Sequence, residues 1–189
     1  AGGCAEHLAQ CDSCRRLALM ADAPAPAPTA EVAGDLERLP PVDDAHYTDW
    51  APLADARGGM GRIFRVRDRR LGRHVAIKQL AEHLGPRERA VLVRRFEREA
   101  RLTARLQHPA IVGIYEAGRF ADGEPFYAMP LLRGVPLTTA IARRPTLADR
   151  LGLLPHLIAV ADAVAFAHDE GIVHRDLKPD NVLVGSSGE

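Results

Sequence analysis

The sequence predicts an α+β protein in which a strand-rich part, residues 47–133, precedes a helical part, residues 134–189. Two observations support this division. Short β-branched and aromatic runs, separated by glycine-containing turns, fill the first part, as expected of antiparallel strands. Apolar residues at three- and four-residue spacing fill the second part and one stretch of the first, residues 87–106, as expected of helices. We therefore expect a sheet with one helix, followed by a separate helical lobe.

The composition is that of an ordinary globular protein. Hydrophobic residues make up 47% and charged residues 26% of the 189 positions, and the formal net charge is zero. A neutral chain has no overall field that would attract nucleic acid, so no nucleic-acid partner is expected. The most apolar run, residues 151–167, contains Asp162 and falls short of the ~20 residues of a membrane span, so no membrane segment is expected in this chain.

The first 20 residues carry all three cysteines. Cys11 and Cys14 follow His7 at spacings that place the three side chains on neighbouring turns of a helix, and Cys4 precedes them. Thiolate and imidazole ligands at such spacing suit tetrahedral zinc. The segment resembles the end of an anti-sigma-factor type of zinc finger that lacks its upstream ligand, so we interpret residues 1–20 as a zinc-finger remnant. Reduced thiols on a short amphipathic helix and redox chemistry are the alternatives.

Residues 21–46 are interpreted as a Pro- and Ala-rich linker. The alternation of Ala and Pro over residues 23–28 keeps the backbone extended and open to water. Few large apolar residues follow, through Pro40 and Pro41. Such a segment cannot bury enough apolar surface to fold, so disorder is expected.

A glycine-rich turn joins the first two expected strands, residues 50–53 and 62–67. The turn contains Ala56, Gly58, Gly59 and Gly61. Residues without bulky side chains let backbone N–H groups approach an anion closely. A plain hairpin turn would have the same composition, so the loop by itself leaves both interpretations open.

Lys78 ends the next apolar strand, residues 75–78, and is one of only two lysines in the chain. An unpaired lysine inside a buried strand would cost on the order of several kcal/mol. Glu99 lies on the apolar stripe of the helix expected at 87–106, which is formed by Leu92, Phe96, Thr103 and Leu106. We therefore predict an ion pair between Lys78 and Glu99, whereas the neighbouring Glu97 would point elsewhere. The alternative is that Glu99 lies only at the edge of the stripe.

Two further strands and a crossing segment complete the strand-rich part. Pro109 ends the helix, because the residue before proline avoids the α region. Residues 111–115 are predicted to form a strand, Asp122-Gly123 a hairpin turn and residues 125–129 the returning strand. Residues 130–134 would then cross to the helical lobe.

The helical part is predicted to contain helices at residues 137–143 and 146–168. The longer helix has an apolar register, and Gly171 ends it. That register comprises Leu157, Val160, Ala161, Val164, Ala165 and His168. The polar sequence His174-Arg175-Asp176-Leu177-Lys178-Pro179-Asp180-Asn181 follows, and a short strand, residues 182–184, leaves it. An acid, a lysine and an amide at short fixed spacing are typical of a phosphoryl-transfer site.

In this order and at these spacings the motifs resemble the eukaryotic-type protein kinase fold, specifically bacterial serine/threonine kinases. The matching segments are Gly58 to Gly61, Val75 to Lys78, Glu99, His108 to Val112 and His174 to Asn181. The resemblance implies a two-lobe fold, with an N-terminal lobe over residues 47–133 and the start of a helical C-terminal lobe over 134–189. It also implies ATP and Mg²⁺ as cofactors, a cytoplasmic kinase domain, and Ser or Thr of a protein substrate as acceptor, with autophosphorylation as one option.

The resemblance further implies roles for individual residues. Lys78, fixed by Glu99, would hold the α- and β-phosphates of ATP. Asp176 would orient and deprotonate the substrate hydroxyl, Lys178 would steady the γ-phosphate, and Asn181 would bind Mg²⁺. The residues implied for binding the nucleotide are Ala56, Gly58, Gly59, Gly61, Ile63, Ala76, Lys78, Met129, Leu132 and Leu183.

The sequence departs from the family pattern at several positions. Ala56 replaces the first glycine of the loop, Asp55 replaces an apolar residue over the adenine, and Pro130 replaces an acid and removes one N–H donor. No Asp-Phe-Gly sequence follows Leu183, and that aspartate would be the main magnesium ligand. We therefore expect the chain to be a fragment that is marginally stable and has no kinase activity on its own.

Four functions are compatible with these residues. An active serine/threonine protein kinase fits because the catalytic positions are filled and because Arg175 precedes Asp176, as in kinases regulated by phosphorylation of the activation loop. The second hypothesis is a pseudokinase or a nucleotide-binding scaffold. The residue at the position of the metal-binding aspartate would distinguish it from an active kinase. A small-molecule phosphotransferase would share the acid-to-amide spacing but not residues 174–179. A regulatory protein based only on the Cys/His cluster is the fourth.

Overall fold

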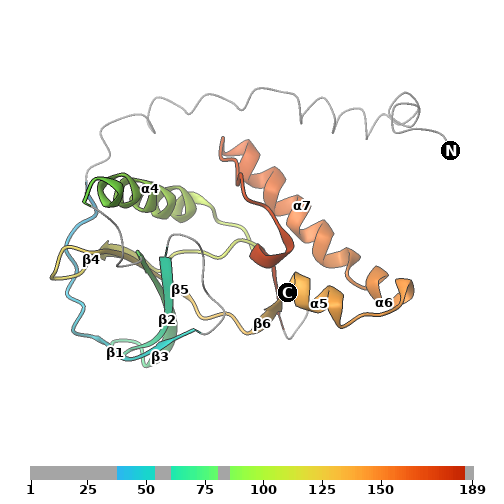
Figure 1. Cartoon of the computed structure of the whole chain (residues 1–189), viewed down its shortest axis with the longest axis horizontal. Coiled ribbons are helices and arrows are strands. Elements are labelled where there is room, and N and C mark those ends of the chain that lie inside the picture. The colour runs from blue at the N-terminus through green and yellow to red at the C-terminus, as the bar shows by residue number, and fades with distance from the viewer. Residues whose placement is uncertain (1–37, 54–60, 81–85, 186–189) are drawn as a thin grey trace.

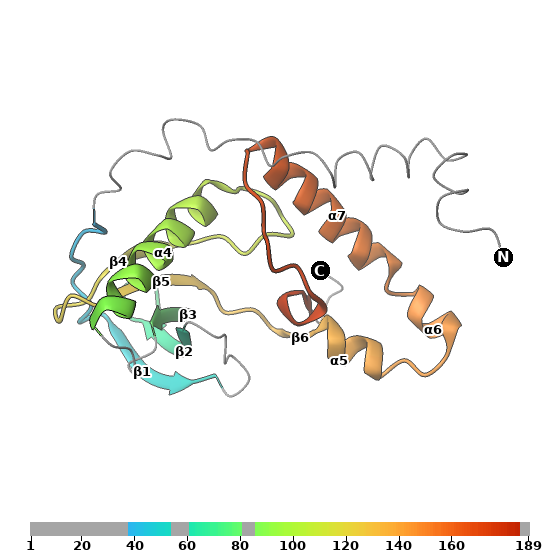
Figure 2. The ribbon, with the colours of Figure 1, turned by 45° about the horizontal axis from the view of Figure 1, so that its top comes forward.

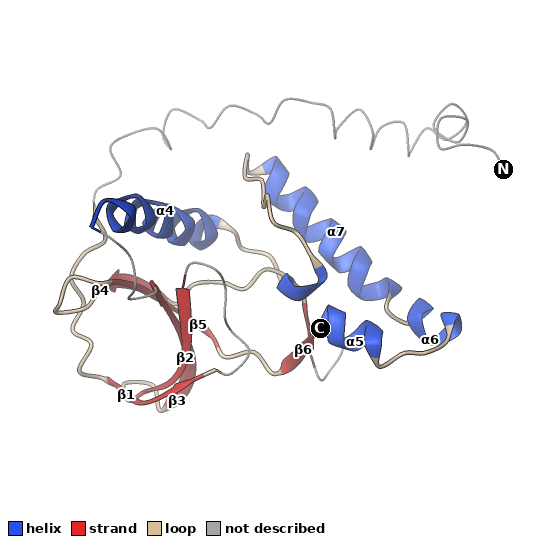
Figure 3. Ribbon diagram, viewed as in Figure 1, coloured by secondary structure: helices blue, strands red, loops and turns tan. Residues whose placement is uncertain are grey.

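The computed structural model of the chain describes residues 38–53, 61–80 and 86–185. Within these ranges a five-stranded sheet and helix α4 form one lobe, and helices α5 to α7 with a two-stranded sheet form the other. Figure 3 shows the strands of the larger sheet gathered in the first lobe and the helices α5, α6 and α7 in the second. The predicted α+β architecture with two lobes is therefore confirmed.

The large sheet is antiparallel throughout, with strand order β1-β2-β3-β5-β4. Its strands are β1 (Tyr47–Pro52), β2 (Gly61–Asp68), β3 (Arg73–Leu80), β4 (Glu116–Arg119) and β5 (Pro125–Pro130). Successive side chains of a strand point to opposite faces. Ala76, Lys78 and Leu80 of β3 therefore lie on one face, and Val75 and Ile77 lie on the other.

Each face of the sheet has its own hydrophobic core. One cluster consists of Tyr47, Val66, Val75, Ile77, Phe120, Phe126 and Ala128. The other consists of Leu80, Phe96, Ala100 and Tyr127, and it lies beneath helix α4 (Pro86–Arg105). This helix agrees with the one predicted at 87–106, and Figure 2 shows it lying along the sheet. Packing of α4 on the face that carries Lys78 sets up the candidate active site.

The prediction of a strand at residues 111–115 is wrong. Strand β4 begins only at Glu116, and pairing with β5 starts just before it, where Tyr115 N donates to Ala128 O at 2.8 Å. Ile111 N instead bonds back to His108 O at 3.0 Å, which forms a turn. Ile114 packs against the cluster beneath α4. Apolar residues of this run therefore contribute to a core although their backbone is irregular. In the sequence, such a run looks the same as a strand that is hydrogen-bonded to its neighbours.

The last residues of the expected linker lie against the sheet. Leu39 is buried, and Pro41 forms a parallel bridge with Arg119 at the edge strand β4. Leu39, Val42, which packs against the core cluster of the sheet, and two backbone hydrogen bonds with Arg119 attach this proline-rich segment. The sequence prediction of disorder therefore fails for residues 38–46, while residues 1–37 lie outside the described part.

The helical lobe contains β6 (Gly134–Pro136), α5 (Leu137–Ala142), α6 (Leu147–Leu151), α7 (Leu154–Asp169), a short 3-10 turn (Pro179–Asn181) and β7 (Leu183–Gly185). The single helix predicted at 146–168 is thus two helices. Thr146 starts α6 with a capping box, in which its hydroxyl accepts from Asp149 N at 3.1 Å. The break at Gly152 and Leu153 follows from Pro155, which has no N–H and crowds the preceding turn.

Helix α7 leaves part of its predicted apolar register exposed. Ala163 and Ala167 are buried, together with Leu153 before the helix, whereas Leu157 is 47% exposed. The stretch Leu147–Asp169 is also long and apolar enough to cross a membrane by length and composition alone, with a mean hydropathy of 1.6. The expectation that this chain has no membrane segment stays a prediction, because length and composition alone do not show a span. Gly171 follows α7 with φ +71°, which is the helix-ending role predicted for it.

Candidate active site

Lys78 and Glu99 form the ion pair that the sequence predicted. Lys78 Nζ lies 2.6 Å from Glu99 Oε1, and the pair links strand β3 to helix α4. The two side chains are 22% and 38% exposed. The ammonium group is therefore held in place by a carboxylate and still reaches solvent, as a group that binds an anionic ligand requires.

Tyr127 is a member of the site that the sequence interpretation missed. Its hydroxyl donates to the same Glu99 Oε1 at 2.8 Å, and its ring centroid lies 5.4 Å from Lys78 Nζ. Burial first, and then the charge of Glu99, raise the pKa of Tyr127 above its ordinary value, so the hydroxyl stays protonated and remains a donor. Tyr127 lies beside Lys78 because the two residues are cross-strand partners in the pairing of β3 with β5. This register cannot be predicted from the sequence.

Gly61 brings the start of β2 against Lys78. A Cβ atom at this position would lie 2.7 Å from Gln79 O and 3.4 Å from Lys78 Cε. Only glycine therefore permits this close approach. The other predicted members of the glycine-rich turn, Ala56, Gly58 and Gly59, lie outside the described residues.

Three predicted nucleotide-binding residues share the face of the sheet that carries Lys78. Ile63 is the cross-strand partner of Lys78, and Ala76 is the partner of Met129. Because directly opposed residues point to the same side, all of them face the same way. Leu132, in the connection between the lobes, and Leu183, at the start of β7, are each 44% exposed.

A second cluster forms on the loop after α7. Lys178 Nζ lies 3.1 and 2.9 Å from the two carboxylate oxygens of Asp176. Asn181 Nδ2 donates to Asp176 O at 2.7 Å and to Asp176 Oδ2 at 3.1 Å. Hydrogen bonds from Lys178 and then from Asn181 hold the pKa of Asp176 below its ordinary value. Asp176 is therefore ionised near neutral pH, as an acceptor of a proton must be.

The loop around Asp176 is held from both ends. Arg175 adopts φ +63°, an uncommon conformation for a residue other than glycine, and His174 Nδ1 accepts from Asp176 N at 3.3 Å. Beyond the loop, β7 pairs with β6, and Thr138 Oγ1 of α5 donates to Asp180 Oδ1 at 2.5 Å. These contacts fix the loop to the first elements of the helical lobe.

His108 connects the two lobes. Its Nδ1 accepts from Ala110 N at 3.1 Å, so in the neutral ring the proton lies on Nε2, which faces Asp162 Oδ2 at 3.2 Å. Its ring also lies 5.4 Å, centroid to centroid, from that of Phe166. Both partners are on α7, so the loop that follows α4 is tied to the helix that precedes Asp176.

The two clusters lie in different lobes. Lys78, Glu99 and Tyr127 belong to the sheet and α4, whereas Asp176, Lys178 and Asn181 belong to the loop after α7. No direct contact joins the two groups within the described ranges. The arrangement can therefore hold an anion at one lobe and accept a proton at the other.

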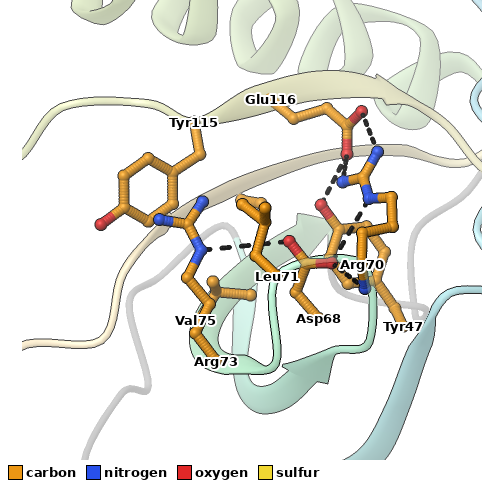
Figure 4. A pocket seen from close by; sticks show the side chains of 9 residues that line it. Tyr47, Asp68, Arg70, Leu71, Arg73, Val75, Tyr115 and Glu116 are labelled. Atoms are coloured by element: carbon orange, nitrogen blue, oxygen red, sulfur yellow. Dashed lines mark hydrogen bonds and ion pairs between the residues drawn. The ribbon is translucent and has the colours of Figure 1, made fainter.

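A cavity of about 350 Å³ lies elsewhere, as shown in Figure 4. Val75 and Ala128 line it, so it opens on the face of the sheet opposite Lys78. Glu116 lies at its edge and accepts from Tyr47 Oη at 2.6 Å and from Arg70 Nη2 at 3.1 Å. This polar network joins β1, the turn after β2 and β4, on the face of the sheet away from the candidate site.

The residues predicted to bind zinc, Cys4, His7, Cys11 and Cys14, all lie outside the described residues. Among the residues that the structure does describe, no group of three or more His, Cys, Asp and Glu side chains could hold a metal ion. In the loop after α7, Asn181 is the residue predicted to bind Mg²⁺.

The fold and both clusters define the class of protein. A sheet with one helix that carries a lysine–glutamate pair, followed by a helical lobe with an aspartate, lysine and asparagine on one loop, is the arrangement of a protein kinase. Residues 56–189 match the protein kinase domain family. The chain belongs to the protein kinase family.

Its relatives are bacterial serine/threonine kinases. The chain is 37% identical over 145 residues to the serine/threonine-protein kinase PknD of Protochlamydia amoebophila, covering 70% of this chain and 14% of that protein. It is 40% identical over 136 residues to the DNA damage-responsive serine/threonine-protein kinase RqkA of Deinococcus radiodurans, covering 69% of this chain and 19% of that protein.

A solved structure supports the same assignment. The kinase domain of Mycobacterium tuberculosis PknI matches with a TM-score of 0.60 and 33% identity, over 77% of this chain and 58% of that domain. The chain thus spans somewhat more than half of that kinase domain and less than a fifth of the two curated relatives named above.

Proposed function

We propose that the protein containing this chain is a serine/threonine protein kinase that transfers the γ-phosphate of ATP to Ser or Thr hydroxyls of proteins. The observation that carries the proposal is the Lys78–Glu99 pair at 2.6 Å. In kinases this pair must be assembled before the nucleotide phosphates are correctly held. The shared identity with bacterial serine/threonine kinases supports the choice of acceptor.

The cluster formed by Lys78, Glu99 and Tyr127 suits the triphosphate of ATP. Lys78 supplies a positive charge held by Glu99, which also accepts from Tyr127, and Gly61 carries no side chain where β2 passes Lys78. Ile63, Ala76 and Met129 offer apolar surface on the same face for a purine ring. Ala56, Gly58 and Gly59 would contribute backbone N–H groups to the phosphates.

The cluster formed by Asp176, Lys178 and Asn181 suits proton removal at the acceptor. Asp176, ionised and oriented by Asn181, would accept the proton of the substrate hydroxyl. Lys178 would neutralise charge on the transferred phosphoryl group, and Asn181 would hold Mg²⁺ through its amide oxygen. Mg²⁺ would supply charge neutralisation between the phosphates when it is bound.

Three further assignments belong to this proposal. The 189-residue chain is expected to be inactive by itself, because within its sequence Asn181 is the only predicted magnesium ligand. The cytoplasm is the expected compartment, since that is where ATP is supplied, and autophosphorylation is an expected side reaction. Zinc binding by Cys4, His7, Cys11 and Cys14 is a prediction that metal analysis of the intact protein would test.

The proposal is tested with the intact protein, labelled ATP and a Ser/Thr-containing acceptor. Lys78→Met and Asp176→Asn should each lower transfer by about 10²-fold or more while the circular dichroism spectrum stays unchanged. Lys78→Met should also weaken ATP binding. Undiminished transfer by either variant would reject the roles assigned here. ATP binding by the unaltered protein without any transfer would identify a nucleotide-binding scaffold instead.

A further inference from the structure

Residues 38–42 pack onto the kinase lobe although they precede residue 56, where the family match begins. Val42 N donates to Arg119 O at 3.0 Å, and Arg119 N donates to Pro40 O at 2.9 Å. A Cβ atom on Gly118 would collide with the Val42 side chain and lie 3.1 Å from Pro40 O. The segment therefore lies directly on β4, in a space that the absence of a side chain at Gly118 provides.

The same segment reaches helix α4 through Glu97. This carboxylate is only 4% exposed, and its Oε1 accepts from Leu39 N at 3.3 Å and from the Arg119 side chain. The sequence predicted that Glu97 would point elsewhere than Glu99, and these contacts confirm it and identify its partners. A buried acid on α4 is thus held jointly by the upstream segment and by strand β4.

Glu97 and Glu99 hold opposite sides of one helix. Residues two positions apart are separated by about 200° around an α-helix. Glu99 is held by Lys78 and Tyr127 beneath the helix, and Glu97 is held by Leu39 and Arg119. A rotation or outward shift of α4 would have to break both sets of contacts. Both sets of contacts therefore act on the same helix.

We propose that Glu97 is a positioning residue for the Lys78–Glu99 pair, and that residues 38–42 act through it as a strap that keeps α4 in its paired orientation. Release of the strap would free Glu97, let α4 shift and separate Glu99 from Lys78. Because the strap continues directly into residues 1–37, a change in that N-terminal segment could reach the nucleotide site by this route. The consequence for ATP depends on the proposed function, whereas the effect on α4 does not.

The strap is tested by hydrogen exchange of the α4 amides in the intact protein. Two variants perturb it independently. Gly118→Ala displaces Val42 and Pro40 without altering any charge, and Glu97→Gln keeps an acceptor for Leu39 N while losing the carboxylate charge opposite Arg119. Each should speed exchange of α4 by about tenfold or more, the effect of one hydrogen bond to a charged group. Glu170→Gln, at an exposed position, is the matched control and should change nothing.

A rescue variant separates displacement of the strap from a general loss of stability. In Gly118→Ala/Val42→Ala the colliding methyl group is removed while the 3.1 Å approach to Pro40 O remains, so exchange of α4 should return part of the way toward the unaltered rate. Unchanged exchange in both Gly118→Ala and Glu97→Gln, or no recovery in the double variant, would overturn the strap. Hydrogen exchange needs no nucleotide, so it tests the strap even if the protein does not bind ATP. Failure to bind ATP would count against the proposed function and not against the strap.

ATP affinity then shows whether Glu97 acts through Glu99. Glu97→Gln should weaken ATP binding about tenfold in the unaltered background and should have no additional effect when Glu99→Gln is already present. Additive losses would mean that Glu97 is a structural residue only, and would reject its positioning role.

Discussion

Removal of the Tyr127 hydroxyl gives a sharp test of how the Lys78–Glu99 pair is held. Tyr127→Phe keeps the buried ring against Phe96 and deletes only the donor that lies 2.8 Å from Glu99 Oε1. Glu99 keeps its bond to Lys78, so the variant isolates one contact of the pair. No other hydrogen bond of the Tyr127 hydroxyl is found among the described residues.

The magnitude follows from the partners. A hydrogen bond to a charged group contributes about 1.5–3 kcal/mol to stability. The Glu99 side chain is 38% exposed, so water can replace part of the lost contact. We therefore expect Tyr127→Phe to lower the free energy of unfolding by about 1.5 kcal/mol, the lower end of that range.

The measurement is urea unfolding followed by circular dichroism. Tyr115→Phe is the matched control, because Tyr115 is 49% exposed and its ring stacks on Arg73 while its hydroxyl has no hydrogen bond within the described part of the chain. That control should stay within about 0.5 kcal/mol of the unaltered protein. If Tyr127→Phe is no more destabilising than Tyr115→Phe, the hydroxyl does not support Glu99 and our account of the pair is wrong.

Two further predictions concern the sheet and the end of α7. Burial alone would raise the pKa of Glu116, but hydrogen bonds from Tyr47 and Arg70 outweigh it and hold that pKa below its ordinary value. Because the pKa of Glu116 is lower in the folded state than in the unfolded state, its contacts with Tyr47 and Arg70 stabilise the protein above pH ~4, and this stability is lost as the pH falls further. Arg70→Gln should therefore make the unfolding free energy decline less steeply between about pH 5 and 3. Gly171→Ala forces a side chain into φ +71° where no neighbouring atom lies within 4 Å, so backbone strain alone should cost about 1 kcal/mol in the same unfolding assay; an unchanged midpoint would show that the turn can relax.

The candidate site could be predicted where its residues follow one another closely. Asp176, Lys178 and Asn181 lie within six consecutive positions, and their contacts follow from short-range geometry in one loop. The Lys78–Glu99 pair could also be predicted, because a strand ending in a lysine and a helix with an acid on its apolar stripe leave few other partners for either charge.

Contacts that depend on register or on distant packing could not be predicted in this way. Tyr127 reaches Glu99 only because β5 pairs with β3 in one particular register. Glu97 was predicted only to point elsewhere than Glu99, and its partners Arg119 and Leu39 come from distant parts of the chain. The break before Pro155 was missed because apolar residues continue on both sides of the proline. Helix propensity added over the whole run therefore predicts one helix instead of two.

The sequence by itself determined the order of strands and helices, the two groups of polar residues and the kinase family, because periodicity and short motifs are local properties of the chain. The tertiary structure decided which face of α7 is buried, where β4 begins, and how α4 is fixed on both sides by Lys78 and by the segment at residues 38–42. These features rest on contacts between residues far apart in the chain, such as Leu39 and Glu97, which are 58 positions apart. Local preference does not encode such contacts, because they form only when separate elements pack together.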